Sequence, residues 1–244
     1  MTGDTAAEFG PVVGACVWII DLALSPSALA ACDAVLSEDE RVRAGRFLRS
    51  EDRDRYRASH AALRLILGRA LGMDPRALTF SAGPAGKPEL AGPERGVLAF
   101  NLSHSGRRAL VGLSTRGYIG VDVEVIRPLP DALRIARGHF ASDEADALAR
   151  LPEEFREAAF FSLWTRKEAV VKALGAGLAL PLDRFSVTVP PAAPRLLRMG
   201  GGPGAWTLHD LDPGPGHAAT AAVMAAGIPL VRHRFPADWP SRLS

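Results

Sequence analysis

The sequence predicts an α+β protein built from two similar α/β subdomains. The apolar, β-branched run of residues 12–22 indicates a strand, which helical patterns follow to residue 71 and short strand patterns follow to residue 114. The same order of strand, helices and strands begins again at residue 118. With 244 residues the chain is long enough for two compact units. We place them at residues 1–116 and 117–244 and expect a ligand cleft between them, because adjoining units commonly create one.

Start and stop signals define the helices of the first half. Ser25-Pro26 has the form of an N-cap followed by a first helical proline. Ser37-Glu-Asp-Glu is a capping box that predicts a second helix to about residue 48. Ser50-Glu-Asp-Arg opens a third helix, which Gly72 ends. Strands are then expected near residues 78–81, 97–103 and 109–114, with a tight turn at Ser105-Gly-Arg-Arg.

The second half shows one alternating strand, three helices and further strands. The first strand covers residues 118–126, and helical patterns cover residues 131–140, 142–150 and 153–174. Strands are expected at residues 185–189, 206–211 and 217–225, and residues 228–235 extend the sheet. The stretch 190–204, which is rich in proline and glycine, predicts a loop or a hairpin tip.

The composition excludes several classes of protein. No apolar run approaches the roughly 18 residues that a membrane helix needs, and the first ten residues lack the basic and apolar regions of a signal peptide. Cys16 and Cys32 have no partners at metal-binding spacing, so we expect buried thiols in a reducing cytoplasm. A net charge of +2 does not argue for nucleic acid. We therefore expect a cytoplasmic protein without membrane or nucleic-acid partners.

Basic residues are unevenly used and unevenly placed. Only Lys87, Lys167 and Lys172 among the 29 basic residues are lysines. Either codon bias replaces lysine wherever arginine serves, or these three positions need a compact ammonium. Seven arginines gather within residues 41–57, with acidic residues between them. They form either a solvated helical face or a surface that faces an anion or an acidic partner.

Two carboxylates lie on one side of the predicted strand 118–126. Residues two apart in a strand point the same way, so Asp122 and Glu124 project together while Val121 and Val123 enter the core. Neighbouring carboxylates repel each other unless a cation lies between them. The pattern fits an Mg²⁺ site, or an exposed strand face that happens to carry two acids.

A second segment places three functional side chains on one stripe of a helix. Trp164, Glu168 and Lys172 are spaced at i, i+4 and i+8. Glu168 and Lys172 could form an ordinary surface ion pair, stabilising by roughly 0.2–0.5 kcal/mol. The tryptophan on the same stripe instead indicates the edge of a core, where a carboxylate and an ammonium could complete a metal site and neutralise phosphate.

Two loop segments add candidate anion ligands. Asn101-Leu-Ser-His104-Ser places hydroxyls and an imidazole beside a tight turn, and its backbone donors could cradle an anion, although a single histidine is more often structural. Gly86-Lys87-Pro88 ends a flexible loop and does not match a nucleotide P-loop.

In this order, the four segments resemble the 4′-phosphopantetheinyl transferases, specifically the larger, surfactin-synthetase-activating (Sfp) type. The resemblance runs from about residue 40 to 190 and includes two weaker patterns, Phe140-Ala-Ser-Asp-Glu144 and Pro181-Leu-Asp-Arg-Phe-Ser186. It implies a monomer whose two halves are related by a pseudo-twofold axis, with coenzyme A in the cleft. It also implies transfer of phosphopantetheine from coenzyme A to a serine of an apo acyl or peptidyl carrier protein, with release of 3′,5′-ADP.

The resemblance also implies roles for the acidic residues. Asp122, Glu124 and Glu168 would hold Mg²⁺ against the pyrophosphate of coenzyme A, and Lys172 would steady the charge of the leaving group. Glu168 would take the proton from the carrier serine, directly or through a water. Glu124 or a metal-bound water stays open as the alternative base.

The nucleotide would be held by the other matched residues. Ser103 and His104 would bind the 3′-phosphate, and Gly86-Lys87-Pro88 and Arg43 would make further phosphate or adenine-side contacts. Arg41 is an alternative to Arg43 in this alignment. All three lysines lie in matched segments, which predicts that each needs a compact ammonium beside phosphate.

Two other functions fit part of the pattern. A non-catalytic protein could hold coenzyme A or a carrier protein in the same cleft, and an Mg²⁺-dependent phosphohydrolase would explain the carboxylates. The sequence does not distinguish fatty-acid, polyketide and nonribosomal-peptide carriers. Because such carriers are commonly acidic around the modified serine, we expect some arginines to contact them.

Overall fold

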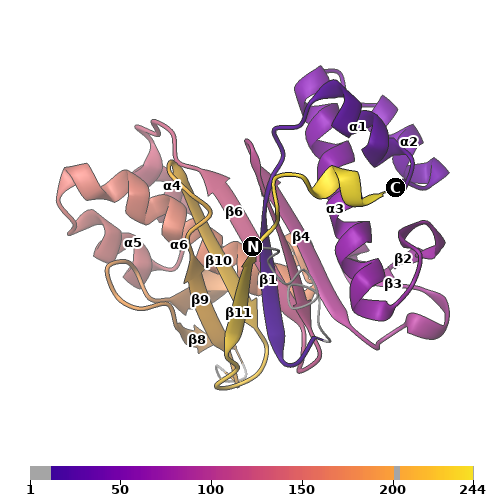
Figure 1. The fold of residues 1–244 in the computed structure, drawn as a ribbon. Coiled ribbons are helices and arrows are strands. Elements are labelled where there is room, and N and C mark those ends of the chain that lie inside the picture. Colours follow the sequence, from indigo (N-terminus) through magenta and orange to yellow (C-terminus); the bar gives the residue numbers. More distant parts are fainter. Residues whose placement is uncertain (1–11, 201–203, 244) are drawn as a thin grey trace, which may run out of the picture.

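The computed structural model describes residues 12–200 and 204–243 and contains two sheets between two groups of helices. Figure 1 shows the helices of the first half outside one sheet and those of the second half outside the other. The first half has helices α1 (Pro26–Asp33), α2 (Glu38–Gly45) and α3 (Ser50–Leu71). The second half has α4 (Ala132–His139), α5 (Ser142–Ala149) and α6 (Glu153–Leu174). In this part of the chain, no helix has the length and apolar character needed to span a bilayer.

The larger sheet has the strand order β11-β1-β5-β4 and the smaller one β6-β10-β9. The larger sheet contains β1 (Ala15–Asp21), β4 (Ala99–Ser105), β5 (Arg108–Ser114) and β11 (Leu230–Arg234). The smaller sheet contains β6 (Ile119–Val125), β9 (Thr207–Leu211) and β10 (His217–Val223). Two short strand pairs complete the fold: β2 (Phe80–Ala82) with β3 (Pro88–Leu90), and β7 (Phe185–Val187) with β8 (Leu196–Met199).

The two halves repeat one order of elements, as the sequence predicts. Each has a strand, two short helices, a long helix, a short strand pair and an antiparallel strand pair. The long helices α3 and α6 both have 22 residues, and each ends at a glycine in the left-handed region, Gly72 with φ 67° and Gly175 with φ 65°. The mixed helix and sheet architecture is confirmed, and the pseudo-twofold axis stays a prediction.

Most predicted elements are present, with three corrections in detail. The capping box at Ser37 forms, with Glu40 accepting from the Ser37 amide at 2.8 Å, but α2 ends at Gly45 rather than near residue 48. The N-cap of α3 is Arg49, so Ser50 is its first helical residue. The predicted loop 190–204 contains β8, whose four residues are too few to show a strand pattern; residues 201–203 of it lie outside the described residues.

Close packing places α6 directly against β6. A side chain at Gly120 would have its Cβ 2.0 Å from the carbonyl oxygen of Ala169, so only glycine permits this approach. Each half has a hydrophobic cluster between its helices and its sheet. A third cluster lies between the two sheets and joins Val17 and Leu110 of the first half to Val121 of the second. The two halves therefore share an apolar interface, and residues of α6 lie over β6.

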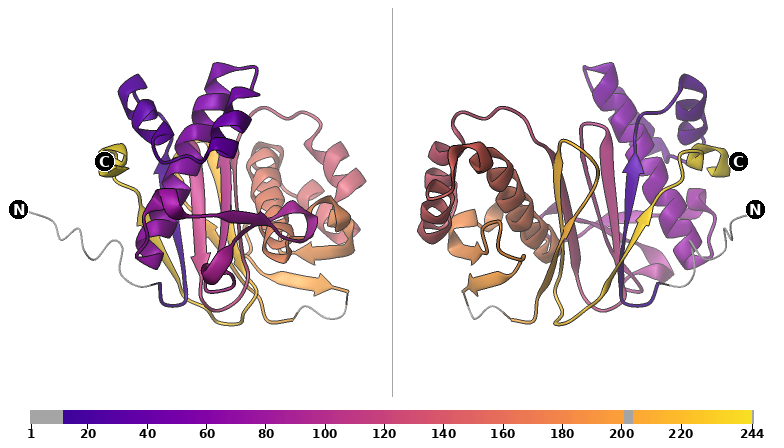
Figure 2. Two further views of the ribbon diagram at one scale, coloured as in Figure 1. Left: turned by 90° about the vertical axis from the view of Figure 1, so that its right-hand side faces the viewer. Right: turned by 60° about the vertical axis from the view of Figure 1, so that its left-hand side comes forward.

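The C-terminal segment returns to the first half. Strand β11 pairs in parallel with β1, and the fully buried Trp239 packs in the core under α1 and α3. Figure 2 shows this segment beside the helices of the first half. The predicted boundary near residue 116 falls between β5 and β6, yet residues 230–239 lie with the first subdomain in space.

Candidate active site

A cavity of about 750 Å³ opens between the two halves. The first half contributes Asn101 and the loop around Gly86-Lys87-Pro88, and the second half contributes residues of α4, α6 and the segment that follows α6. Trp164, Glu168 and Lys172 all line this cavity, as their predicted helical stripe requires. The structure thus confirms that a cleft lies between the halves and that this stripe faces it.

Asp122 is the most deeply buried of the three predicted metal-binding acids. Its side chain is only 4% exposed, which excludes the alternative of two acids on an exposed strand face. Oδ1 accepts hydrogen bonds from Lys172 Nζ at 2.5 Å and from Ser103 Oγ at 3.0 Å. Oδ2 has no hydrogen-bond partner among the described residues. Burial raises the pKa of Asp122, although the Lys172 ammonium opposes this effect.

Glu124 and Glu168 complete an acidic cluster around Asp122. Burial raises the pKa of Glu124, and the charge of Asp122 raises it further. The pKa of Glu168 is raised by burial, then by Asp122 and Glu124, against the lowering effect of Lys172. The charge of Asp122 therefore acts on both glutamates.

The donor set fits a hard cation chemically, but the side chains are not arranged as a metal site in this structure. Within residues 12–200 and 204–243, no three acidic, histidine or cysteine side chains form a group that could hold a metal ion. Asp122 bonds instead to Lys172, and Glu124 Oε2 accepts from Ser105 Oγ at 3.0 Å. The free Oδ2 atom of Asp122 is the observation that favours a cation here.

His104 lies on the face of β4 opposite to that of Ser103 and Ser105, near several positive charges. Partial desolvation lowers the pKa of His104, and the charges of Lys172 and Arg55 lower it further. His60, a partly buried residue that the sequence did not single out, stacks on Tyr56 at 3.8 Å between ring centroids. Burial lowers the pKa of His60 to about 3, and the charges of His104 and Arg43 add to this effect.

The charges of Arg43 and His104 act on His60, and the charge of Arg55 acts on His104, so an anion would be favoured near these groups, although none of the three lines the cavity between the halves. Arg43 lies over the Tyr56 ring at 5.8 Å. By contrast, the Ser103 hydroxyl is turned away from this group, toward Asp122 and Lys172. Of the predicted nucleotide contacts, His104 and Arg43 both lie close enough to His60 to lower its pKa, whereas the side chain of Ser103 bonds to Asp122 and Lys172.

Lys87 connects the two halves. Its Nζ donates to the carbonyl oxygens of Ile119, at 3.2 Å, and Ala173, at 3.1 Å. Burial lowers the pKa of Lys87 to about 8, and Glu89 partly opposes this. Gly86-Lys87-Pro88 lines the cavity as predicted, while the Lys87 ammonium is occupied by backbone oxygens rather than turned to open space.

Lys167 overturns part of the prediction about the three lysines. Its ammonium is fully buried and donates to Glu144 at 2.6 and 2.8 Å and to the Phe185 carbonyl at 2.8 Å. It cannot contact phosphate in the cleft, because its side chain is 0% exposed and points from α6 into the core. Glu144 could not be identified as its partner from the sequence, because the two residues are 23 positions apart.

Sequence reasoning also missed Ser105 and Arg55. The alternation Asn101-x-Ser103-x-Ser105 could have shown that three polar side chains share one face of a strand. Arg55 was counted in the arginine cluster, but no local pattern connects it to His104, which lies in a different element.

Comparison with known proteins identifies similar sequences on both halves. A model described as 4′-phosphopantetheinyl transferase superfamily matches residues 118–223, and one described as 4′-phosphopantetheinyl transferase, N-terminal, matches residues 24–115. The 4′-phosphopantetheinyl transferase HetI of Nostoc sp. is 38% identical over 213 residues, which cover 86% of this chain and 88% of HetI.

Two further relatives match a shorter region. A putative 4′-phosphopantetheinyl transferase of Synechocystis sp. is 43% identical over 151 residues, 62% of this chain and 61% of that protein. The 4′-phosphopantetheinyl transferase Sfp of Bacillus subtilis is 35% identical over 153 residues, 62% of this chain and 66% of Sfp. The match thus spans about three fifths of the Synechocystis protein and most of HetI.

Proposed function

Because the chain belongs to the 4′-phosphopantetheinyl transferase family, we propose that it transfers the phosphopantetheine arm of coenzyme A to a serine of an apo acyl or peptidyl carrier protein. The second product is 3′,5′-ADP. The observation that carries the proposal is the buried Asp122 carboxylate, which bonds to Lys172; Lys172 and Glu168 both line the cavity between the two matched halves.

Coenzyme A is proposed as co-substrate because the cleft offers both charge and apolar surface. The Lys172 ammonium lines the cavity, and its charge and that of Arg55 act on His104, a setting that suits the 3′-phosphate. Gly86-Lys87-Pro88 forms one wall of the cavity and Trp164 another, which suits a long ligand of mixed polarity.

Asp122, Glu124 and Glu168 are proposed to hold Mg²⁺. Carboxylate oxygens are the ligands that this cation prefers, and Asp122 Oδ2 lacks a hydrogen-bond partner among the described residues. When bound, Mg²⁺ neutralises pyrophosphate charge and polarises the phosphorus that is attacked.

The transfer step itself depends on side chains in and beside the cleft. The carrier serine oxygen attacks the phosphorus next to the pantetheine arm, and the bond from this phosphorus to the bridging oxygen breaks, so 3′,5′-ADP leaves. Glu168, which lines the cavity, takes the serine proton. Glu124 is the alternative base. The Lys172 ammonium steadies the charge that develops on the leaving phosphate.

The test combines the purified chain, coenzyme A, Mg²⁺ and apo carriers of the fatty-acid, polyketide and nonribosomal-peptide classes. We expect one carrier or more to gain the mass of phosphopantetheine, with loss of the gain when Mg²⁺ is chelated. Binding of coenzyme A without transfer to any carrier would indicate a non-catalytic binder, and cleavage of coenzyme A without a carrier would indicate a phosphohydrolase. We further propose that the enzyme acts as a monomer in the cytoplasm, which light scattering and cell fractionation would test.

A further inference from the structure

Strands β4 and β6 lie side by side but belong to different sheets. Three side chains of β4, at every second position, accept hydrogen bonds from backbone amides of β6. Asn101 Oδ1 accepts from Val121 N at 2.8 Å, Ser103 Oγ from Val123 N at 3.4 Å, and Ser105 Oγ from Val125 N at 3.1 Å. We call Asn101, Ser103 and Ser105 the side-chain seam. It satisfies amides at the edge of β6 that would otherwise lack a partner strand.

Two members of the side-chain seam also donate to the acidic cluster. Ser103 Oγ donates to Asp122 Oδ1 at 3.0 Å, and Ser105 Oγ donates to Glu124 Oε2 at 3.0 Å. In both cases the serine accepts from the amide of the residue that directly follows the carboxylate it serves. Each hydroxyl therefore joins a carboxylate to the backbone beside it.

The direction of these hydrogen bonds is determined by their partners. A carboxylate can only accept, a backbone amide can only donate, and a hydroxyl has one proton. The proton of Ser105 must therefore point to Glu124 while its lone pair accepts from Val125. Ser103 receives an additional N–H from Lys172, at 2.9 Å, so its proton must likewise point to Asp122.

We propose that Ser103 and Ser105 are positioning residues that restrict the rotation of the Asp122 and Glu124 carboxylates and thereby favour the binding of a divalent cation. The proposal rests on the proposed function, since it concerns the same acidic cluster. Each serine binds one oxygen of its carboxylate and limits the rotation of the group, so that the other oxygen can face a cation. For Asp122 this other oxygen is the unpartnered Oδ2. A cation binds more tightly to carboxylates that are already oriented, because less rotational entropy is lost on binding.

Ser105 provides the sharper test, because its hydroxyl contacts only Val125 N and Glu124 in the described structure, whereas Ser103 also contacts Lys172. Ser105→Ala removes the bond to the carboxylate and one bond of the side-chain seam. Asn101→Ala is the matched control, because it leaves the Val121 amide without its partner but touches no carboxylate. Ser105→Thr keeps the hydroxyl.

The readout is equilibrium binding of Mn²⁺ as a probe for Mg²⁺, followed by electron paramagnetic resonance of full-length protein, alongside unfolding temperature. We expect Ser105→Ala to weaken Mn²⁺ binding by about tenfold or more. Ser105→Thr should restore it, and Asn101→Ala should lower the unfolding temperature without this loss. Equal Mn²⁺ affinity in Ser105→Ala and Asn101→Ala would overturn the proposal, as would wild-type protein that binds no Mn²⁺.

The failures of the two proposals can be told apart. If wild-type protein modifies a carrier while Ser105→Ala binds Mn²⁺ normally, transfer stands and the positioning role is wrong. If no carrier is modified but Ser105→Ala loses Mn²⁺ affinity and the threonine variant regains it, the positioning role stands and the transferase function is wrong.

Discussion

The ammonium of Lys172 lies 2.5 Å from Asp122 Oδ1 and so connects helix α6 to strand β6. Ser103 Oγ is the second acceptor of the same ammonium, at 2.9 Å. The lysine is 29% exposed and the aspartate 4%, so the pair lies between the cavity and the core. The acidic cluster is thus partly neutralised by a cation of the chain itself.

Replacing Lys172 tests whether a compact ammonium is required. Lys172→Met should lower kcat/KM on the order of 100-fold, because one preorganised positive donor is lost. We expect Lys172→Arg to lower it at least about tenfold, because a planar guanidinium does not fit between Ser103 and Asp122 as an ammonium does. Carrier modification followed by mass spectrometry measures both. Full activity of Lys172→Arg would show that charge alone suffices.

Glu168→Gln should reduce transfer and stabilise the protein at neutral pH. A carboxyl whose pKa is higher in the folded than in the unfolded state contributes stability below its unfolded pKa, and this is lost as the pH rises through the folded-state pKa. A neutral glutamine avoids the cost of the buried charge, with an expected gain on the order of 1 kcal/mol. Chemical unfolding checks this. The gain should shrink toward acidic pH, and a variant that is less stable at every pH would contradict the explanation.

Binding of coenzyme A should be accompanied by proton uptake at His104. Desolvation and the charges of Lys172 and Arg55 lower its pKa before binding, and a bound 3′-phosphate would raise it. Affinity should therefore fall as the pH rises through the pKa of the complex. Calorimetry in buffers of different ionisation enthalpy measures the uptake. The proton uptake should be smaller when wild-type protein binds 3′-dephospho-coenzyme A and when His104→Gln binds coenzyme A. Uptake equal to that of wild-type protein with coenzyme A in both cases would show that the 3′-phosphate binds elsewhere.

The arginines near the start of α3 divide into two groups. Arg41, Arg53, Arg55 and Arg57 form ion pairs with acids of the same chain. Among residues 12–200 and 204–243, Arg43, Arg46 and Arg49 form no ion pair, and since Arg43 lies over the Tyr56 ring, Arg46 and Arg49 make up the second group. The exposed Leu48 lies between them. The second group is therefore available to an acidic partner.

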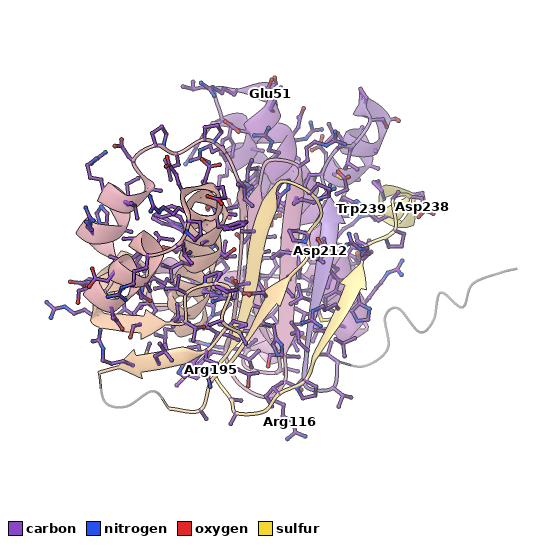
Figure 3. All side chains as sticks on the ribbon, turned by 90° about the vertical axis from the view of Figure 1, so that its left-hand side faces the viewer. Glu51, Arg116, Arg195, Asp212, Asp238 and Trp239 are labelled. Carbon is purple, nitrogen blue, oxygen red and sulfur yellow. The ribbon has the colours of Figure 1, made fainter. Side chains whose placement is uncertain are left out.

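The double substitution Arg46→Glu with Arg49→Glu should raise the KM for an acidic carrier by about tenfold, because charge steers association. This rise in KM should be smaller at high salt. The KM for coenzyme A should stay as in wild type. Arg116→Glu is a matched control, since Arg116 is exposed and lies at the opposite end of the molecule from Glu51 at the start of α3 (Figure 3). If both variants had the same effect, general charge rather than a local contact would be responsible.

Features that depend on neighbouring residues could be predicted from the sequence. The capping box of Ser37, the shared side of Asp122 and Glu124, and the α6 stripe follow from helix and strand periods. The layout of two halves followed from the order of such local patterns.

Features set by packing between distant segments could not be predicted. Lys87 meets Ile119 and Ala173, and Lys167 meets Glu144, only because the halves and the helices pack as they do. The three lysines all lie in segments that match one family, yet one bonds to Asp122, one to backbone oxygens and one to a buried glutamate. Only the three-dimensional arrangement separates these roles.

The pairing of β11 with β1 has a consequence for how the chain reaches this fold. The first strand is made early in synthesis, but its parallel neighbour and the buried Trp239 are made last. A ribosome must therefore release nearly the whole chain before the first sheet gains its fourth strand. The amino-terminal half cannot complete its core ahead of the carboxy-terminal half, so the two halves finish folding as one unit.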